Sequence, residues 1–337
     1  MDFKHTVLFT GAGFTANFGG FLAKEMWAKI FNNPKLVSAR SVKLQLKKNF
    51  DFEDIYSKVV GGNSYFSENE ANIFEDVVNQ AYLSMDDVLK QPSWFDVSGI
   101  NPANLGKFLE YFTKREDNKT GVCFTLNQDL FLERNYGWQP LVPPSMRYAE
   151  RFGNIDSKDL NSNSYKLLPT EQDLNDYKSN LSAEFAYIKL HGSTRWVADN
   201  GKETKIIGIN KLQTINKIPL LKWYFELFQQ AICRHNVNLV IIGYGFRDYH
   251  INECIVKAVK EFGTKLYIIS PENPEDFSFR LSFKHPKTAT INEVNEEGVR
   301  IWHAVEGYFP YKLKDIFPIS GAFTAEKSEI FDAVGKI

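Results

Sequence analysis

The chain has 337 residues, of which 43% are hydrophobic and 15% aromatic, with 40 basic and 41 acidic residues. This length and composition can bury a substantial core, either as one large α/β domain with insertions or as two domains. The net charge of -1 excludes a global field that would recruit nucleic acid or anionic lipid. We therefore expect neither direct nucleic-acid binding nor association with a membrane.

Three cysteines, Cys123, Cys233 and Cys254, are scattered through apolar stretches. No two of them have the spacing of metal ligands, so the sequence predicts no zinc site and no metal cofactor. Free cysteines in a core are typical of a reducing compartment. No export signal opens the chain and no apolar run approaches the length of a membrane span. A cytoplasmic location is therefore expected.

Short apolar, β-branched or aromatic runs predict buried strands. Five are clear and a sixth is weaker: His5–Thr10, Gly121–Leu126, Ala186–Leu190, Val237–Ile242 and Lys265–Ile269, then Val299–Ala304. Near-continuous apolar strands that alternate with helical segments predict an α/β fold with a doubly wound, mostly parallel, Rossmann-like sheet. In such a sheet the ligand lies beyond the carboxyl ends of the strands.

Two long insertions interrupt this pattern. Residues 21–120 far exceed a crossover connection and predict a helical insertion subdomain, whereas about 136–184 is rich in Asn, Ser, Pro and Tyr and predicts loops. Helical periodicity occurs at Phe21–Phe31, Phe52–Val60, Asn69–Met85, Pro102–Lys114, Leu220–Arg234 and Ile251–Phe262. We expect one catalytic domain over residues 1–317, followed by a C-terminal tail, 318–337, to which the sequence assigns no role.

The first predicted strand ends in the turn Gly11, Ala12, Gly13, Phe14 and Thr15, with a helical-looking segment from Phe21. A strand, a tight turn and a helix start can surround a pyrophosphate with backbone N–H groups. Taken alone, the same glycines could simply connect a strand to a helix.

Three further strands end in polar or Gly-containing turns: Thr125–Asp129 (Thr-Leu-Asn-Gln-Asp), Lys189–Ser193 (Lys-Leu-His-Gly-Ser) and Gly243–Phe246 (Gly-Tyr-Gly-Phe). Each has a structural alternative. Asn127 and Asp129 could cap the helix that follows, and a lone histidine before glycine, His191, could be a hydrogen-bonded structural residue. The aromatic residues Tyr244 and Phe246 could belong to the core, Asp248 could cap the helix from Ile251, and His250 could merely cover that helix end.

In order and strand-end placement the four motifs resemble the sirtuin superfamily. Sirtuins open with Gly-Ala-Gly-x-Ser, where Thr15 stands here for Ser, and carry Thr-Gln-Asn-x-Asp, matched at Thr125–Asp129. Their catalytic histidine, in a His-Gly pair, is matched by His191, and their Gly-Thr-Ser turn by Gly243–Phe246. The resemblance implies that NAD is bound as a substrate. Expected NAD contacts are Gly11, Ala12, Gly13, Phe14, Thr15, Asn127, Asp129, Gly243, Tyr244, Gly245, Phe246 and Ser270, with Asn127 and His191 as catalytic residues.

The chemistry of nicotinamide release suits these residue types. A neutral leaving group departs from a cationic pyridinium, so the site needs a held pyrophosphate, a polarised ribose and a placed nucleophile rather than a general acid. Asn127 would hydrogen-bond ribose hydroxyls or orient a water. His191, expected to titrate near neutral pH, would act as the base. By the resemblance, Asp129 would bind the nicotinamide carboxamide.

Two departures from sirtuin deacylases favour a different reaction. The segment Thr194–Lys217 lacks the four zinc cysteines, and Gly20–Lys24 replaces the Ile-Pro-Asp-Phe-Arg that follows their first motif. The details instead resemble bacterial sirtuin-like NADases of antiphage defence, which cleave NAD to nicotinamide and ADP-ribose. We therefore predict an NAD glycohydrolase that depletes NAD. The alternatives are a non-catalytic sensor of NAD or ADP-ribose, or an NAD-dependent protein deacylase or ADP-ribosyltransferase; an oxidoreductase is weaker because the first turn lacks a third glycine.

Control by assembly is expected, because an NAD-depleting effector has to be held inactive until it is triggered. The aromatic-rich segments Phe50–Tyr65 and Tyr136–Tyr148 could line an interface of a homo-oligomer, or simply pack internally. The resemblance implies a HerA-type ring ATPase as partner or, less favoured, a short Argonaute.

Overall fold

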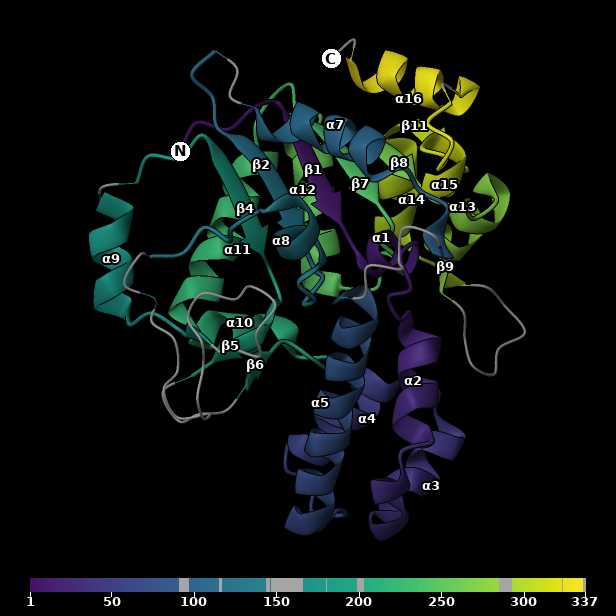
Figure 1. Ribbon diagram of the computed structural model, residues 1–337. Coiled ribbons are helices and arrows are strands. Elements are labelled where there is room, and N and C mark those ends of the chain that lie inside the picture. The colour runs from purple at the N-terminus through teal and green to yellow at the C-terminus, as the bar shows by residue number, and fades with distance from the viewer. Residues whose placement is uncertain are drawn as a thin grey trace.

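A six-stranded parallel sheet forms the centre of the computed structural model, which describes residues 1–90, 97–114, 117–143, 146, 166–179, 181–198, 203–284, 293–322 and 324–335. The strand order is β11-β8-β7-β1-β2-β4. Its members are β1 (Thr6–Thr10), β2 (Gly121–Thr125), β4 (Phe185–Lys189), β7 (Asn238–Ile242), β8 (Lys265–Ile269) and β11 (Val305–Phe309). From β1 the chain first adds two strands on one side and then three on the other, which is the order of doubly wound dinucleotide-binding folds. The predicted fold class is confirmed (Figure 1).

The five clear strand predictions agree with the structure to within one residue at either end, but the sixth is wrong. Residues 299–303 belong to α14 (Glu296–His303), and the last strand, β11, starts two residues later at Val305. Two acidic residues in the first turn of α14 and two basic residues in its last turn complement the helix dipole. Gly298 also lets α14 approach α13 (Pro274–Ser282) closely, since a Cβ there would lie 1.7 Å from the carbonyl oxygen of Leu281.

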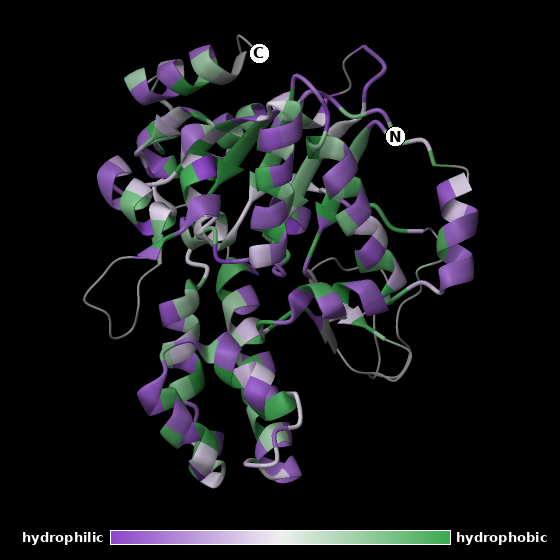
Figure 2. Cartoon of the chain, turned by 180° about the vertical axis from the view of Figure 1, so that it is seen from behind, coloured by the Kyte–Doolittle hydropathy of each residue, from purple (hydrophilic) through white to green (hydrophobic). Residues whose placement is uncertain are grey.

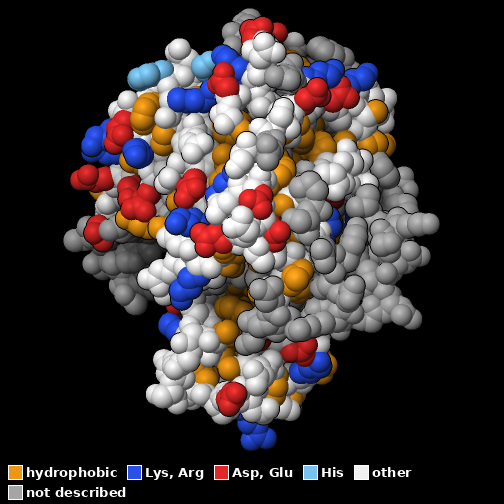
Figure 3. Space-filling model, turned by 90° about the vertical axis from the view of Figure 1, so that its left-hand side faces the viewer, with side chains coloured by type: hydrophobic (Ala, Val, Ile, Leu, Met, Phe, Trp, Pro, Cys, Tyr) orange, Lys and Arg blue, Asp and Glu red, His pale blue; other side chains and the backbone are white. Residues whose placement is uncertain are grey.

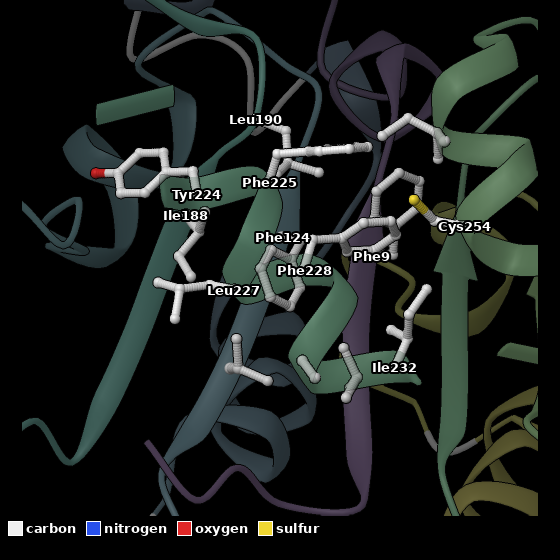
Figure 4. Close-up of a cluster of buried hydrophobic side chains, with 14 of the residues drawn as sticks. Phe9, Phe124, Ile188, Leu190, Tyr224, Phe225, Leu227, Phe228, Ile232 and Cys254 are labelled. Atoms are coloured by element: carbon white, nitrogen blue, oxygen red, sulfur yellow. The ribbon is translucent and has the colours of Figure 1, made fainter. Parts of the chain in front are cut away.

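Helices cover both faces of the sheet because alternate strand residues are apolar on both sides. Phe9 belongs to a core with α11 (Pro219–Ile232) and α12 (Tyr249–Phe262), whereas Leu8 belongs to the opposite core with α7 (Pro102–Thr113) and α8 (Phe131–Tyr136). Figure 4 shows the first of these cores, in which Phe228 of α11 packs on Phe9 and Phe124 with ring centroids 5.5 and 5.1 Å away. Truncation of such a buried ring to Ala costs about 3–5 kcal/mol.

The predicted helical insertion is largely an arm that projects from one end of the sheet (Figure 1). It contains α2 (Ala23–Phe31), η1 (Pro34–Ser38), α3 (Arg40–Lys48), α4 (Phe52–Val60) and α5 (Glu68–Lys90). The arm has its own apolar core, in which Ile30, Ile55 and Val77 are buried, and Figure 2 shows hydrophobic and hydrophilic residues alternating along its helices. The α7 helix packs on the sheet instead.

The first motif differs from the prediction in one respect. A short helix, α1 (Ala12–Ala16), begins directly after Gly11 rather than near Phe21. The helix that follows Gly11 is therefore a separate element of only five residues, and it is not the start of the arm helix α2.

The remaining elements lie around the sheet edges. A three-stranded sheet joins β3 (Lys166–Leu167), β5 (Gly192–Val197) and β6 (Glu203–Lys205), and α10 (Lys211–Lys217) follows it. The segment predicted as loops contains β3 and α9 (Glu171–Ser179), while residues 144–145 and 147–165 lie outside the described part of the chain. The other elements are β9 (Phe283–Lys284), β10 (Glu293–Val294), α15 (Leu313–Ile316) and α16 (Ala325–Gly335).

The segment after residue 318 packs on the sheet domain, because Ile330 of α16 is buried in the same core as Leu8, on the face covered by α7 and α8. Within the described residues, no helix is long and apolar enough to cross a bilayer.

Candidate functional site

The turns after β1 and β7 are in direct backbone contact where the strand order reverses. The N–H of Gly13 donates to the carbonyl of Gly243 at 2.8 Å, and the N–H of Gly11 to that of Ile242 at 3.0 Å. A Cβ at Gly13 would lie 2.7 Å from the Cα of Gly243, and Gly243 itself has φ +66. Glycine at these positions is thus required by loop-to-loop packing, and two of the N–H groups expected to face a pyrophosphate are already engaged.

Asn127 joins the second motif to the first. Its Nδ2 donates to the carbonyl of Gly11 at 2.9 Å and to the hydroxyl of Thr15 at 3.4 Å. Its backbone N–H donates to Thr125 Oγ1 at 3.0 Å, which also accepts from Thr10 Oγ1 at 2.8 Å. Because the protein uses the donor end of this amide, its oxygen is the atom left to accept a hydrogen bond from a ribose hydroxyl or a water.

His191 follows β4 and makes a contact that the sequence did not predict. Its Nε2 lies 3.2 Å from the Nε2 of His250 at the start of α12, and the two residues are only 4% and 5% exposed. Burial lowers the pKa of His191 well below its ordinary value, although the nearby Asp248 carboxylate opposes the shift. Burial likewise lowers the pKa of His250 to about 4. The expectation that His191 titrates near neutral pH is therefore wrong for this form, in which both rings are neutral at pH 7.

Behind the histidines lies a half-buried ionic chain that reaches the arm. Asp248 occupies the N-cap position of α12 but makes no side-chain capping bond, because its carboxylate accepts from Lys211 Nζ at 2.6 Å. Lys211 also pairs with Glu53 of α4 at 2.7 Å. The sequence prediction that Asp248 caps the helix is therefore correct for the backbone position and wrong for the side chain.

Three of these side chains could in principle approach one metal ion. His191, Asp248 and His250 each offer a ligand atom, and these atoms lie within 4.8 Å of one another. The ammonium of Lys211, however, already neutralises the carboxylate that would complete such a site.

Asp129 is buried beneath the site. Its carboxylate accepts from the backbone N–H of Phe131 at 3.0 Å, while Lys189 donates to its carbonyl and to Glu133 at 2.7 Å. Burial raises the pKa of Asp129 to about 6. In this form the side chain supports the start of α8, which is the structural alternative considered above, and it does not face solvent.

The remaining predicted residues separate into two groups. Ala12 and Gly245 are exposed beside the first and fourth turns, whereas the rings of Phe14, Tyr244 and Phe246 are buried in the core. This placement is the structural alternative for Tyr244 and Phe246, and the expectation that Phe14, Tyr244 and Phe246 contact NAD stays a prediction.

Tyr244 is held by its hydroxyl, which donates to Asn252 Oδ1 at 2.8 Å, and Phe246 adopts φ 54. Ser270 directly follows β8, where its N–H donates to the carbonyl of Phe309 at 3.1 Å. Hydrogen bonds thus bring residues 11–15 together with Asn127 and Gly243, and a separate contact brings His191 together with His250.

One hollow in the described part of the chain is lined by none of the predicted site residues. A hollow of about 930 Å³ lies at the opposite, amino-terminal edge of the sheet, lined among others by His5, Asn236, Lys265 and Glu306. Figure 3 shows basic and acidic side chains interspersed on one face of the molecule.

A doubly wound parallel sheet with polar turns gathered at the carboxyl ends of its strands defines the class of nucleotide-binding α/β proteins. More particularly, the chain belongs to the SIR2-like domain family, whose profile matches residues 121–291, just over half of the chain. Members of this family are generally NAD-dependent enzymes. The matched segment includes Asn127, His191 and Gly243, and it begins after the first glycine turn and the arm. A search of curated proteins found no match.

Proposed function

We propose that the protein is an NAD glycohydrolase, which uses water to cleave NAD into nicotinamide and ADP-ribose. The observation that carries the proposal is the placement of Asn127 and His191 just beyond the carboxyl ends of neighbouring strands. The β2–β4 register pairs Thr125 with Lys189, and each of the two polar residues lies two positions beyond that pair. An amide and an imidazole therefore both follow the carboxyl ends of adjacent strands.

Each residue has a distinct part in the proposed reaction. The amide oxygen of Asn127, fixed by the bond of its nitrogen to Gly11, would accept from a ribose hydroxyl or from the attacking water. The neutral ring of His191 is the form that accepts a proton. As the bond from C1′ to the pyridinium nitrogen breaks, its electron pair neutralises the pyridinium, so nicotinamide leaves without a general acid.

The segment after His191 favours hydrolysis over deacylation. It carries no cysteine between residues 194 and 217. It is instead stabilised by apolar packing, because Trp196, Ile206 and Ile215 are buried in the core that contains Phe9 and α11. A zinc-bound module that would complete a groove for an acylated peptide has no counterpart in these residues.

The test is nicotinamide release by purified protein from NAD alone and from NAD with an acetylated peptide. We expect release without peptide, and loss of release in His191→Ala and Asn127→Ala, with nucleotide affinity changed by no more than about tenfold, the size of one hydrogen bond. Release that strictly requires the peptide would identify a deacylase instead.

A sensor of NAD or ADP-ribose is the second candidate, because the resting structure buries His191 and occupies its Nε2. Binding of NAD by calorimetry, with no turnover in any assembly state, would favour the sensor.

In the cell the enzyme would act as an NAD-depleting effector of antiphage defence, controlled by assembly. The proposed assemblies are a homo-oligomer and a complex with a HerA-type ring ATPase, with a short Argonaute as the less favoured partner. Light scattering combined with NAD turnover across a concentration series tests this. A monomer that hydrolyses NAD at full rate with or without partners would contradict it.

A further inference from the structure

The contact between His191 and His250 restricts where their protons lie. The two Nε2 atoms are 3.2 Å apart and the rings are inclined by 31° with centroids 5.3 Å apart. Both rings are neutral, and a neutral imidazole carries one N–H and one lone pair. A hydrogen bond between them therefore has one donor and one acceptor, and only two arrangements exist.

The two arrangements leave His191 in different chemical states. If His250 donates, the lone pair of His191 is consumed at Nε2 and its Nδ1 carries the proton, so neither nitrogen can accept another proton while the contact lasts. If His191 donates, its lone pair is on Nδ1, which is the nitrogen that the contact leaves available. Only the second arrangement gives a base that works without breaking the pair.

The surroundings of His250 hold it in place to receive this bond. Asp248 precedes it by two residues, Lys211 fixes the Asp248 carboxylate at 2.6 Å, and Glu53 of the arm fixes Lys211 at 2.7 Å. The ring of Phe225 packs on His250 at a centroid distance of 5.8 Å. The charged groups that face the pair are thus the Asp248 carboxylate and the Lys211 ammonium, with Glu53 behind them.

We propose that His250 is a positioning residue that accepts the Nε2–H of His191, so that Nδ1 of His191 is the atom that takes a proton during hydrolysis. This inference rests on the proposed function. A water O–H gives its proton to Nδ1 while the water oxygen bonds to C1′ and the C1′–N bond breaks. The His191 imidazolium still donates its Nε2–H to His250, near the Asp248 carboxylate. It releases the proton on Nδ1 to solvent after the products leave. Because Glu53 belongs to α4, the ion pairs of Lys211 with Glu53 and Asp248 extend from the arm to the residue two positions before His250.

The proton placement can be measured without substrate. The chain has six histidines, so ¹⁵N-histidine spectra of the full-length protein, assigned with His191 and His250 variants, read the tautomer of each ring. We expect the Nε2–H form of His191 in the wild type and a mixture of both forms in His250→Leu. A proton on Nδ1 of His191 in the wild type, an unchanged His191 signal in His250→Leu, or a metal-ligand signature that a chelator removes would overturn the proposal.

Kinetics separates positioning from a structural role. In His250→Leu we expect kcat to fall about 10- to 100-fold, a part of what a general base supplies, with KM changed less than about threefold. His250→Gln retains an acceptor of similar reach and should recover most of kcat. His235→Leu is the matched control, because His235 is exposed at the far edge of the sheet, where its Nδ1 lies 3.2 Å from the carbonyl oxygen of Phe262. Equal losses in His250→Gln and His250→Leu would contradict the proposal, and if the wild type does not cleave NAD the spectra still decide the pairing.

Discussion

The side-chain nitrogen of Asn127 donates to the carbonyl oxygen of Gly11 at 2.9 Å, so one amide fastens the end of β2 to the turn after β1. These residues are 116 positions apart in the chain, and the bond orients the amide oxygen of Asn127 by fixing its nitrogen.

Asn127→Asp tests this orientation. The substitution keeps the shape but places a carboxylate oxygen against the Gly11 carbonyl, so the donor is lost and two acceptors face each other. We expect the free energy of unfolding to fall by about 1–3 kcal/mol and NAD turnover to fall at least about 100-fold. Denaturant unfolding and nicotinamide release measure the two effects. Asn135→Asp, on α8, is the control and should leave turnover unchanged, and an Asn127→Asp enzyme with normal turnover would remove the role assigned to the amide.

Gly13→Ala tests the loop-to-loop contact. The added Cβ would lie 2.7 Å from the Cα of Gly243, and backbone atoms cannot move aside without separating the two turns. We expect a loss of about 1–3 kcal/mol in the free energy of unfolding and a loss of nucleotide binding. Gly245→Ala is the matched control, because its nearest neighbour would be the Arg247 side chain at 4.0 Å. Similar thermal melting temperatures for the two variants would contradict the packing argument.

Five strands of the sheet were predictable because each of them is a short apolar run, whose pattern is local. The helix that replaced the strand expected at Val299–Ala304 was missed because the decisive signal, acidic residues in its first turn and basic residues in its last turn, is a charge pattern rather than a periodicity. The contact of His191 with His250 joins residues 59 positions apart. Its only local sign is the Asp-x-His spacing at the start of α12, which a capped helix shares.

The glycine turns show a second reason why prediction stops short of the site. Residues 11–13 and Gly243 have the composition of a phosphate-binding turn, yet their packing against each other requires glycine without any ligand. Composition alone cannot distinguish a backbone that approaches a phosphate from one that approaches another backbone.

Asp86 of α5 anchors the arm to the sheet domain, and its replacement tests that connection. Its carboxylate, which is fully buried, accepts two bonds from Arg134 at 2.8 and 2.7 Å and lies 3.4 Å from Arg195. Asp86→Ala removes the negative charge from between two buried guanidinium groups, so we expect a loss of about 3–5 kcal/mol in the free energy of unfolding. Asp76→Ala, which breaks an exposed pair with Lys35, should cost less than about 1 kcal/mol. Equal costs in denaturant titrations would show that the buried cluster does not anchor the arm.

Asp129→Asn tests whether burial raises the pKa of the Asp129 carboxyl in the folded protein. Burial raises the folded-state pKa of Asp129 from 3.8 to about 6, so the folded protein holds this proton more tightly than the unfolded chain. The resulting stabilisation is complete below the unfolded pKa and is lost as the pH rises through about 6. Asn mimics the protonated acid and still accepts from the N–H of Phe131, while Lys189 keeps its bond to Glu133.

We therefore expect the free energy of unfolding of Asp129→Asn, relative to that of the wild type, to increase between pH 4 and pH 7 by at most about 3 kcal/mol, so that the variant gains stability relative to the wild type. Asp76→Asn, at an exposed position, serves as the control and should give a difference that varies little with pH. Denaturant unfolding of the three proteins at half-unit intervals measures this directly. A difference between Asp129→Asn and the wild type that stays constant over the range would mean that Asp129 is ionised throughout, with Lys189 outweighing the effect of burial.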